Sequence, residues 1–330
     1  MFIIENYPLA VFFCSITMLC WGSWANTQKL AASSWRFELF YWDYVIGIVL
    51  LGILFAFTLG SFGNAGRGFL DDLKQAGQSN ILSALTGGII FNAANILLCA
   101  AIAIAGMSVA FPVGIGLALV IGVVVNYIGH PLGNVTILLS GVVLIVIAIL
   151  LNAFAYRKMQ SVNKNPSSKG LLLSIISGVL MGLFYKYVAA SMFSDFTIPE
   201  EGKLSPYTAV VLFSAGILLS NILFNTILMR RPFAGEPVSY KDYFAGGFKN
   251  HVTGILGGMI WCIGMSFSII ASGKAGPAIS YGLGQGATVV AALWGIYVWK
   301  EFKDVKGVKS LLNAMLCCYI IGLILIILSH

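Results

Sequence analysis

Charged side chains are scarce in this 330-residue chain. Only 9% of its residues are Asp, Glu, Lys or Arg, whereas soluble domains carry about 25%. Hydrophobic residues make up 59% of the chain, and the mean hydropathy is +0.93. This balance excludes an ordinary soluble domain and indicates an integral membrane protein. Because the apolar segments run for about 20 residues, they predict membrane-spanning helices and not the short alternating strands of a barrel.

The chain also lacks the patterns that support catalysis or metal binding. Its three histidines, His130, His251 and His330, lie far apart, and it has no HExxH, G-x-S-x-G or metal-ligand spacing. All six cysteines fall within apolar segments, which is typical of small hydrophobic side chains and not of disulfides. We therefore expect no enzyme activity, no cofactor and no metal, and the absence of a Walker motif excludes ATP as the energy source. A membrane-embedded enzyme and a channel are the other classes to weigh against a transporter.

An internal repeat organises the chain. Residues 87–127 align without a gap on residues 257–297, at a shift of 170 positions, with about 10 of the 41 pairs identical. Several matched pairs are glycines, such as Gly88 with Gly258. Each copy consists of two apolar segments joined by a short link, as in a duplicated transporter. Unrelated Gly- and Ala-rich membrane segments can look alike, but aligned glycines without a gap favour duplication.

Ten apolar segments are long enough to cross a membrane. The expected spans are 7–30, 37–60, 80–105, 107–129, 134–155, 170–192, 206–229, 250–272, 276–299 and 308–328. A polar linker at 156–169 separates a first five-helix repeat, residues 1–155, from a second, residues 170–330. An odd number of spans per half makes the second half enter from the opposite side. The sequence therefore predicts an all-α integral membrane protein of ten transmembrane helices in two inverted five-helix repeats.

Lysine and arginine are unevenly distributed between the two sides. Fourteen of the 19 fall on the side of the linker, four fall on the other side, and Lys186 lies within a span. The richer side is expected to be cytoplasmic, so both termini should face outward from a plasma (bacterial inner) membrane. The net charge of +7 reflects this bias. Because no basic helix with interleaved aromatic residues accompanies it, no nucleic-acid partner is expected.

Asp43 is the one acid that lies well inside a predicted span. It follows the start of span 37–60 by six residues, which puts it about 9 Å deep at 1.5 Å per residue. A carboxylate at that depth is costly and is usually paired or functional. We predict that Asp43 carries the coupling proton. The alternatives are an interfacial acid, or an acid paired with Lys29 or Arg36.

The first half offers five candidate solute-binding residues. Trp21 and Trp24 flank a glycine, and Asn26 follows, so these residues could form a cavity wall on which a flat solute stacks. Close helix packing through the glycine is the alternative. Asn92 and Asn95 lie three positions apart on one helix face near mid-membrane. Amides in hydrocarbon need partners, which are either a polar solute or neighbouring helices.

The second half offers four more candidates. Lys186 is either a site lysine or a side chain that reaches outward to the interface. Trp261 is the repeat-mate of Phe91, and the inverted repeat predicts that the two lie at similar depth in facing helices. Tyr281 and Gln285 stand among glycines where the first copy is apolar, which favours contact with the solute.

Ordered motifs along nearly the whole chain resemble one known family. They are Ile4-Glu5, Gly22-x-Trp24, Asp43-Tyr44, Gly87-Gly88-Ile89 followed by Asn95, Gly106-x-Ser108-Val109, Val120-Ile121-Gly122-x-x-x-Asn126-Tyr127, Lys203-Leu204-x-x-Tyr207-Thr208-Ala209, Gln285, and Trp294-Gly295-Ile296 with Glu301. In this order and spacing they resemble the ureide permease family of the drug/metabolite transporter superfamily. The resemblance implies ten helices around a central cavity and proton-coupled import of a ureide or nucleobase such as allantoin or uracil. Sugar porters of the glucose/ribose and rhamnose types look like relatives and supply the alternative substrate class.

The chain departs from the plant members that it resembles. Its central loop is short, Gly282 stands where they carry an acid, and Lys186 stands where they have no lysine. These departures affect the prediction of the substrate more than the prediction of transport. The resemblance implies a small polar solute, protons and membrane lipid as partners, and it leaves a homodimer open.

Overall fold

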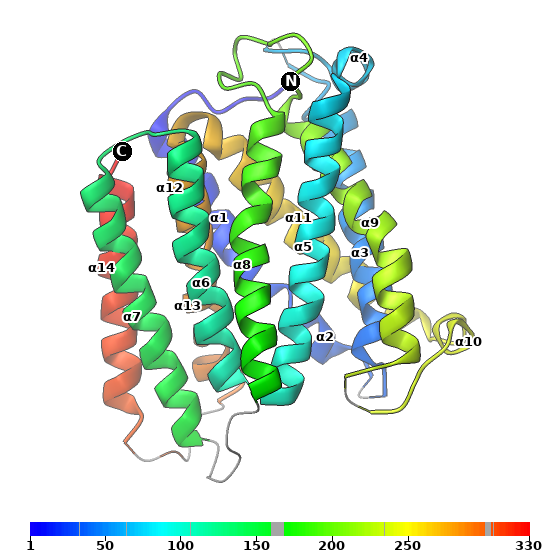
Figure 1. Ribbon diagram of the computed structural model, residues 1–330, viewed down its shortest axis with the longest axis vertical. Helices are drawn as coiled ribbons and strands as arrows, with labels where there is room; N and C mark the ends of the chain where they lie inside the picture. The colour runs from blue at the N-terminus through cyan, green and yellow to red at the C-terminus, as the bar shows by residue number, and fades with distance from the viewer. Residues whose placement is uncertain are drawn as a thin grey trace.

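The computed structural model describes residues 1–32, 34–63, 65–105, 107–159, 168–233, 235–300, 305 and 307–330. Apart from an isolated bridge between Met192 and Leu204, its regular structure in these ranges is helical (Figure 1). The helices are α1 (Tyr7–Ser23), α2 (Asn26–Leu30), α3 (Phe37–Phe57), α4 (Phe69–Gln75), α5 (Gln78–Ala105), α6 (Met107–Gly129), α7 (Val135–Met159), α8 (Ser168–Ser191), α9 (Pro206–Arg230), α10 (Tyr240–Phe244), α11 (Phe248–Ala275), α12 (Pro277–Gly284), α13 (Ala287–Leu293), a π-helical turn η1 (Trp294–Val298), and α14 (Lys309–Leu328). The predicted all-α class is confirmed.

Eight of the described helical segments are long and apolar enough to cross a membrane. They are Phe37–Phe57, Gln78–Ile102, Val135–Lys158, Ser168–Ser191, Pro206–Arg230, Phe248–Ala275, Pro277–Val298 and Lys309–Leu328. Tyr7–Ser23 and Val113–Gly129 are apolar but shorter. Large apolar side chains such as Leu219, Ile222 and Leu223 point outward from α9, more than half exposed. Outward-facing side chains of this kind are typical of helices surrounded by lipid, so the protein is a multi-pass membrane protein.

The first predicted span is broken into α1 and α2. Asn26 Nδ2 donates a hydrogen bond to the Ser23 carbonyl oxygen at 3.1 Å, and the Thr27 hydroxyl donates to the Trp24 carbonyl oxygen at 2.7 Å. Side chains of this type compete with the backbone for its carbonyl groups, which weakens a helix at that point.

The predicted span 276–299 is also broken. It divides into α12, α13 and η1, and the first division falls at Gln285, between two glycines. Glycine costs roughly 1 kcal/mol relative to alanine inside a helix. At the start of the span, Gly276 adopts φ +77°, which lets the chain reverse sharply from α11 into α12.

The helices pack in two corresponding sets. In one set, α5 contacts α8 and α9, and α6 contacts α8; in the other, α11 contacts α1 and α3, and both α12 and α13 contact α1. Helices α3 and α9 contact each other, and α7 pairs with α14 at one side of the bundle (Figure 1). The contacts of α5 with α8 and α9 therefore resemble those of α11 with α1 and α3.

Two glycines bring backbones into direct contact within these sets. A methyl group at Gly88 in α5 would overlap the carbonyl oxygen of Phe213 in α9. One at Gly258 in α11 would overlap the carbonyl oxygen of Tyr44 in α3. Such crossings need a residue without a side chain, and small residues fill this role in membrane helix bundles.

The two ends of the bundle differ in what they carry. Both chain termini and α4 lie at the upper end in Figure 1, which we call the terminal end. Helices α2 and α10, the end of α7 and the start of α8 lie towards the opposite end, which we call the linker end. Glu301, a residue of the family resemblance, lies outside the described residues.

Candidate functional site

A cluster of aromatic rings occupies the centre of the bundle. Trp261 from α11 lies with its ring centroid 4.5 Å from that of Phe91 in α5, so the rings of these two residues lie side by side. Phe213 in α9 stacks on Trp261 at 6.1 Å, and Trp21 in α1 stacks on it at 5.9 Å. Trp261 is only 5% exposed. Two of the predicted solute-binding tryptophans therefore meet at the centre of the bundle, where they pack on other rings.

A polar group lies next to this cluster. The Tyr41 hydroxyl donates to Asn92 Oδ1 at 2.9 Å, and Asn92 Nδ2 donates to the Ser220 hydroxyl at 2.9 Å. Asn95 Nδ2 donates to the Tyr41 hydroxyl oxygen at 3.1 Å. Asn92 is wholly buried and ties α3, α5 and α9 together, so in this arrangement it serves the interhelical role that was the alternative to solute binding. Asn95 shares the network but is bonded only through its amide nitrogen.

Tyr44 provides an unused hydrogen-bonding group at the centre. Its ring lies 5.4 Å from that of Tyr41 and 4.6 Å from that of Trp24. Its side chain is wholly buried, and its hydroxyl has no hydrogen-bond partner among the described residues. A buried hydroxyl without a partner costs about 1–3 kcal/mol, so a polar group that reaches it stabilises the protein. The sequence motif Asp43-Tyr44 contained this residue, but spacing alone does not show that its hydroxyl is unpaired.

Asp43 lies at the linker end and is bonded by two residues from the second half. The Tyr243 hydroxyl in α10 donates to Asp43 Oδ1 at 2.6 Å, and His251 Nδ1 in α11 lies 2.9 Å from Oδ1 and 3.1 Å from Oδ2. The Asp43 side chain is only 1% exposed, and His251 Nδ1 forms an ion pair with it when protonated. Trp35 packs edge-on against His251 at 5.1 Å. We call Asp43, His251, Tyr243 and Trp35 the linker-end cluster.

Neither predicted cationic partner of Asp43 is correct. Arg36 forms its ion pair with Glu38, at 2.6 Å between Nη2 and Oε1. Lys29 lies over the ring of Trp299, 4.5 Å from its centroid. Histidine was missed because the three histidines are distant in sequence. The signal was present, since Asp43 and His251 each follow closely after the start of a span predicted to begin on the same side.

Tyr243 remains a hydrogen-bond donor to Asp43. Burial raises the pKa of its hydroxyl well above the ordinary value, and the hydrogen bond to Asp43 and the charge of that carboxylate add to the shift. The phenol therefore stays protonated through the physiological pH range. Because α10 has only five residues, the donor is carried by a short element outside the bundle proper.

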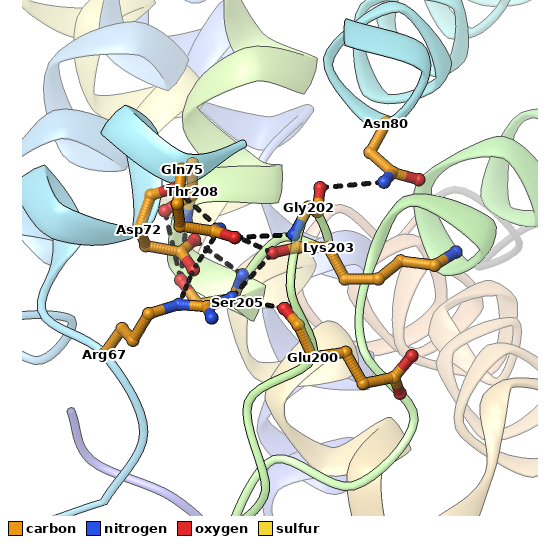
Figure 2. A network of polar contacts seen from close by, with 9 residues as sticks. All are labelled: Arg67, Asp72, Gln75, Asn80, Glu200, Gly202, Lys203, Ser205 and Thr208. Carbon is orange, nitrogen blue, oxygen red and sulfur yellow. Dashed lines mark hydrogen bonds and ion pairs between the residues drawn. The ribbon is translucent and has the colours of Figure 1, made fainter. Parts of the chain in front are cut away.

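A second polar network holds the terminal end together (Figure 2). Arg67 donates from Nε to Asp72 Oδ1 at 3.0 Å, and from Nη2 to the carbonyl oxygens of Glu200 and Lys203 at 2.7 and 2.9 Å. The backbone N–H of Ser205 donates to Asp72 Oδ2 at 2.7 Å. Asp72 is wholly buried although it belongs to the short helix α4 in a connection between spans. Sequence reasoning placed both charged residues in a loop and gave them no role.

Gln75 completes this terminal-end network. Its Nε2 donates to the Lys203 carbonyl oxygen at 2.9 Å, and its Oε1 accepts from the Gly202 N–H at 2.6 Å. Asn80 at the start of α5 donates to the Gly202 carbonyl oxygen at 2.8 Å. The network therefore joins the connection before α5 to the connection before α9, which come from different halves of the chain.

The other candidates lie apart from the centre. Lys186 is exposed on the outer surface of α8, which fits the alternative of a lysine that reaches outward and gives it no place in a central site. The Tyr281 hydroxyl donates to the Met181 carbonyl oxygen at 3.0 Å and packs α12 against α8. Gln285 is 9% exposed at the break between α12 and α13. Asn26 accepts from Trp299 Nε1 at 2.7 Å, at the linker end.

Comparisons with known proteins agree on one family. A sequence profile described as "Ureide permease" matches residues 40–168 and 156–329. "Ureide permease 1" of Arabidopsis thaliana is 21% identical over 386 residues, covering 100% of this chain and 99% of that protein. "Ureide permease 2" of the same plant is 21% identical and covers 92% of each chain.

Two further likenesses are weaker or concern the fold alone. A "Putative sugar uptake protein" of Streptococcus agalactiae is 29% identical over 129 residues, which cover 36% of this chain and 43% of that protein. A solved structure titled "Crystal structure of protein" superposes with a TM-score of 0.62 and 15% identity, covering 97% of this chain and 98% of the other. With the apolar helices and the profile match over most of the chain, these findings make the protein a multi-pass membrane transporter and not an enzyme, and the chain belongs to the ureide permease family.

Proposed function

We propose that the protein is a secondary active transporter that imports a small polar solute, a ureide or nucleobase such as allantoin or uracil, together with protons. The observation that carries this proposal is the buried Asp43–His251 pair with its Tyr243 donor. A carboxylate and an imidazole in contact can exchange a proton within the physiological range, and intramembrane pairs of this kind mark proton relays. The relatives named ureide permeases support the solute class.

The solute site lies at the central rings. Trp24, Tyr44 and Trp261 offer flat faces for a planar ring, and aromatic rings within 4.5–7 Å of one another have the spacing at which stacking is favourable. The Tyr44 hydroxyl and Asn95 offer hydrogen bonds to carbonyl and N–H groups of the solute. Because the rings now pack on each other, solute binding requires them to separate, as a change between inward- and outward-facing states would do.

Alternating access follows from an inverted repeat of ten helices, with halves at 1–155 and 170–330. The two glycine crossings correspond in sequence. A shift of 170 positions takes Gly88 to Gly258, and a shift of 169 takes Tyr44, which Gly258 contacts, to Phe213, which Gly88 contacts. The same shifts relate a second pair, in which Gly47 meets Ile255 and Gly216 meets Leu85. Matching crossings at matching positions support a two-fold relation between the halves, and such halves exchange conformations to expose a central site to each side in turn.

The terminal end faces outward and the linker end faces the cytoplasm. The excess of lysine and arginine on the linker side supports this orientation in a plasma or bacterial inner membrane. Labelling of single-cysteine variants from outside tests it. Strong labelling at position 158 with none at position 2 would reverse the orientation.

Uptake into proteoliposomes tests the function. Radiolabelled allantoin and uracil are offered with an imposed proton gradient, and again after a protonophore has dissipated it. Accumulation above the outside concentration that depends on the gradient is expected. Equilibration that ignores the gradient would favour a channel. The same assay with glucose, ribose and rhamnose as competitors tests the second candidate, a proton-coupled sugar porter, which the sugar uptake relative supports over part of the chain.

A further inference from the structure

A pocket separate from the central rings opens at the linker end. It has a volume of about 140 Å³ and lies between the end of α1, α2, α7, the α13–η1 segment and α14. A single buried water needs about 10–15 Å³ on this measure, so the pocket has room for a small solute. Gly22, Ala25, Ala292 and Gly295 leave the space, because none of them carries a side chain larger than a methyl group.

Asn152 in α7 lines this pocket. Its Oδ1 is buried without any partner among the described residues. A buried amide oxygen without a partner costs about 1–3 kcal/mol, so native proteins rarely keep one without a reason. Two polar neighbours are already engaged, since the Tyr319 hydroxyl donates to Thr288 at 2.6 Å and the Thr288 hydroxyl donates to the Gln285 carbonyl oxygen at 3.0 Å.

The remaining lining restricts what can bind. None of the residues that line the pocket is acidic, so nothing there attracts a cation, and the ammonium group of the basic lining residue Lys29 lies over the ring of Trp299, 4.5 Å from its centroid. The amide of Asn26 is fixed, because Nδ2 donates to the Ser23 carbonyl oxygen and Oδ1 accepts from Trp299. Most of the surface is apolar and narrow, which suits a flat, neutral molecule. A carboxamide offers one acceptor and two donors side by side, so its best complement is a group with an N–H next to a carbonyl.

We propose that this pocket binds a neutral, planar solute that carries a carbonyl group next to an N–H group, and that Asn152 recognises that pair with both ends of its carboxamide. Ureides, lactams and the pyrimidine nucleobases share this chemistry. The inference rests on the proposed transport of such solutes, and it adds a binding station on the linker side of the central rings. Asn152 was not among the residues that the sequence singled out.

Binding to the full-length protein in lipid nanodiscs tests the pocket. Trp299 lines it and is one of seven tryptophans, so the fluorescence change that Trp299→Phe abolishes reports ligand in the pocket. Allantoin and uracil are the probes, and glucose, which lacks the N–H and carbonyl pair, is the negative probe. Saturable change with allantoin or uracil, but not with glucose, is the expected result. No change with either amide probe would overturn the proposal.

The variant Asn152→Leu keeps the shape of the side chain and removes both polar groups. Because Asn152 Oδ1 has no partner to lose among the described residues, the variant should unfold at the same temperature as the wild type or higher, and its affinity for allantoin at Trp299 should fall about tenfold or more. Asn313→Ala, on an exposed face of α14, is the control and should bind normally. Unchanged affinity in Asn152→Leu would overturn the role of Asn152. Loss of folding in this variant would also overturn it, since it would make Asn152 structural.

Transport measured beside binding separates the two proposals. If the wild type binds ligand at Trp299 but does not accumulate solute under a proton gradient, the pocket proposal holds and the proposed function is wrong. If the wild type accumulates solute but shows no fluorescence change at Trp299, the proposed function holds and the pocket proposal is wrong.

Discussion

The terminal-end network and the linker-end cluster each join the two halves of the chain, but with different chemistry. At the terminal end, the guanidinium of Arg67 holds Asp72 and two backbone carbonyl oxygens. Guanidinium cannot be deprotonated in proteins, so its charge is fixed. At the linker end, Asp43 meets His251, and this contact is an ion pair only when the imidazole is protonated. The difference teaches that the linker-end contact can be neutral or charged according to the imidazole, whereas the guanidinium of the terminal-end network stays charged.

The repeat does not impose this difference. Shifts of 169 and 170 positions take Asp43 to Leu212 and His251 to Ile81, both apolar. The second half therefore has no acid and the first half no imidazole at the corresponding place.

Removal of Asp72 should have the largest effect on the stability of the protein. The variant Asp72→Ala leaves Arg67 Nε and the Ser205 N–H without their carboxylate partner, although Arg67 Nη2 keeps two carbonyl oxygens, and breaking a buried ion pair on one side costs about 3–5 kcal/mol. A large fall in thermal stability in detergent is expected. Asp71→Ala is the matched control, because Asp71 pairs with Lys74 at 3.5 Å with both side chains 77% exposed, and it should change little. Equal effects in the two variants would show that the terminal-end network contributes nothing.

Neutralisation of Asp43 should abolish coupling. In Asp43→Asn, uptake driven by a proton gradient should be lost, while exchange of solute between compartments of equal pH should continue. The physical reason is that an amide keeps a hydrogen-bonding shape but carries no proton between the two states. Uptake and exchange in proteoliposomes measure both quantities. Normal accumulation by this variant would disprove the coupling role, and failure to fold or express would make the acid structural.

Loss of the Tyr243 hydroxyl should have a moderate effect. Tyr243→Phe removes a hydrogen bond to a carboxylate, which contributes about 1.5–3 kcal/mol. Because the pKa of Tyr243 is raised, its contribution is fully present below the ordinary value of about 10 and is lost only as pH rises through the higher folded-state value. The loss of thermal stability should therefore be the same at pH 6 and pH 8. A loss that changes between these pH values would mean that another group governs the contact.

Replacement of Lys186 should have the smallest effect. The side chain is exposed on α8, and surface substitutions usually change stability by less than about 0.5 kcal/mol. Lys186→Gln should therefore bind and accumulate allantoin as the wild type does. A several-fold change in affinity would return Lys186 to the solute site and would mean that α8 turns its exposed face inward during transport.

The sequence by itself determined the all-α membrane class and the positions of most apolar helices. The hydropathy of a span depends on about 20 neighbouring residues, so spans can be predicted without knowledge of the fold. Glycines such as Gly88 and Gly258 were visible as matched pairs because close backbone contact tolerates no other residue. The alignment of the two copies paired Phe91 with Trp261, whose ring centroids lie 4.5 Å apart.

Only the tertiary structure decided the partners. His251 reaches Asp43 across 208 positions, and Arg67 reaches the Lys203 carbonyl oxygen across 136. Asn92 is fully used by neighbouring helices, whereas Tyr44 and Asn152 each keep a buried polar atom without a partner in the described part of the chain. Whether a polar side chain is satisfied depends on which helix face meets it at a few ångströms, and a helix periodicity does not specify that. The physical reason is that membrane insertion is a property of each segment, while hydrogen bonding is a property of pairs of segments whose approach is set by packing.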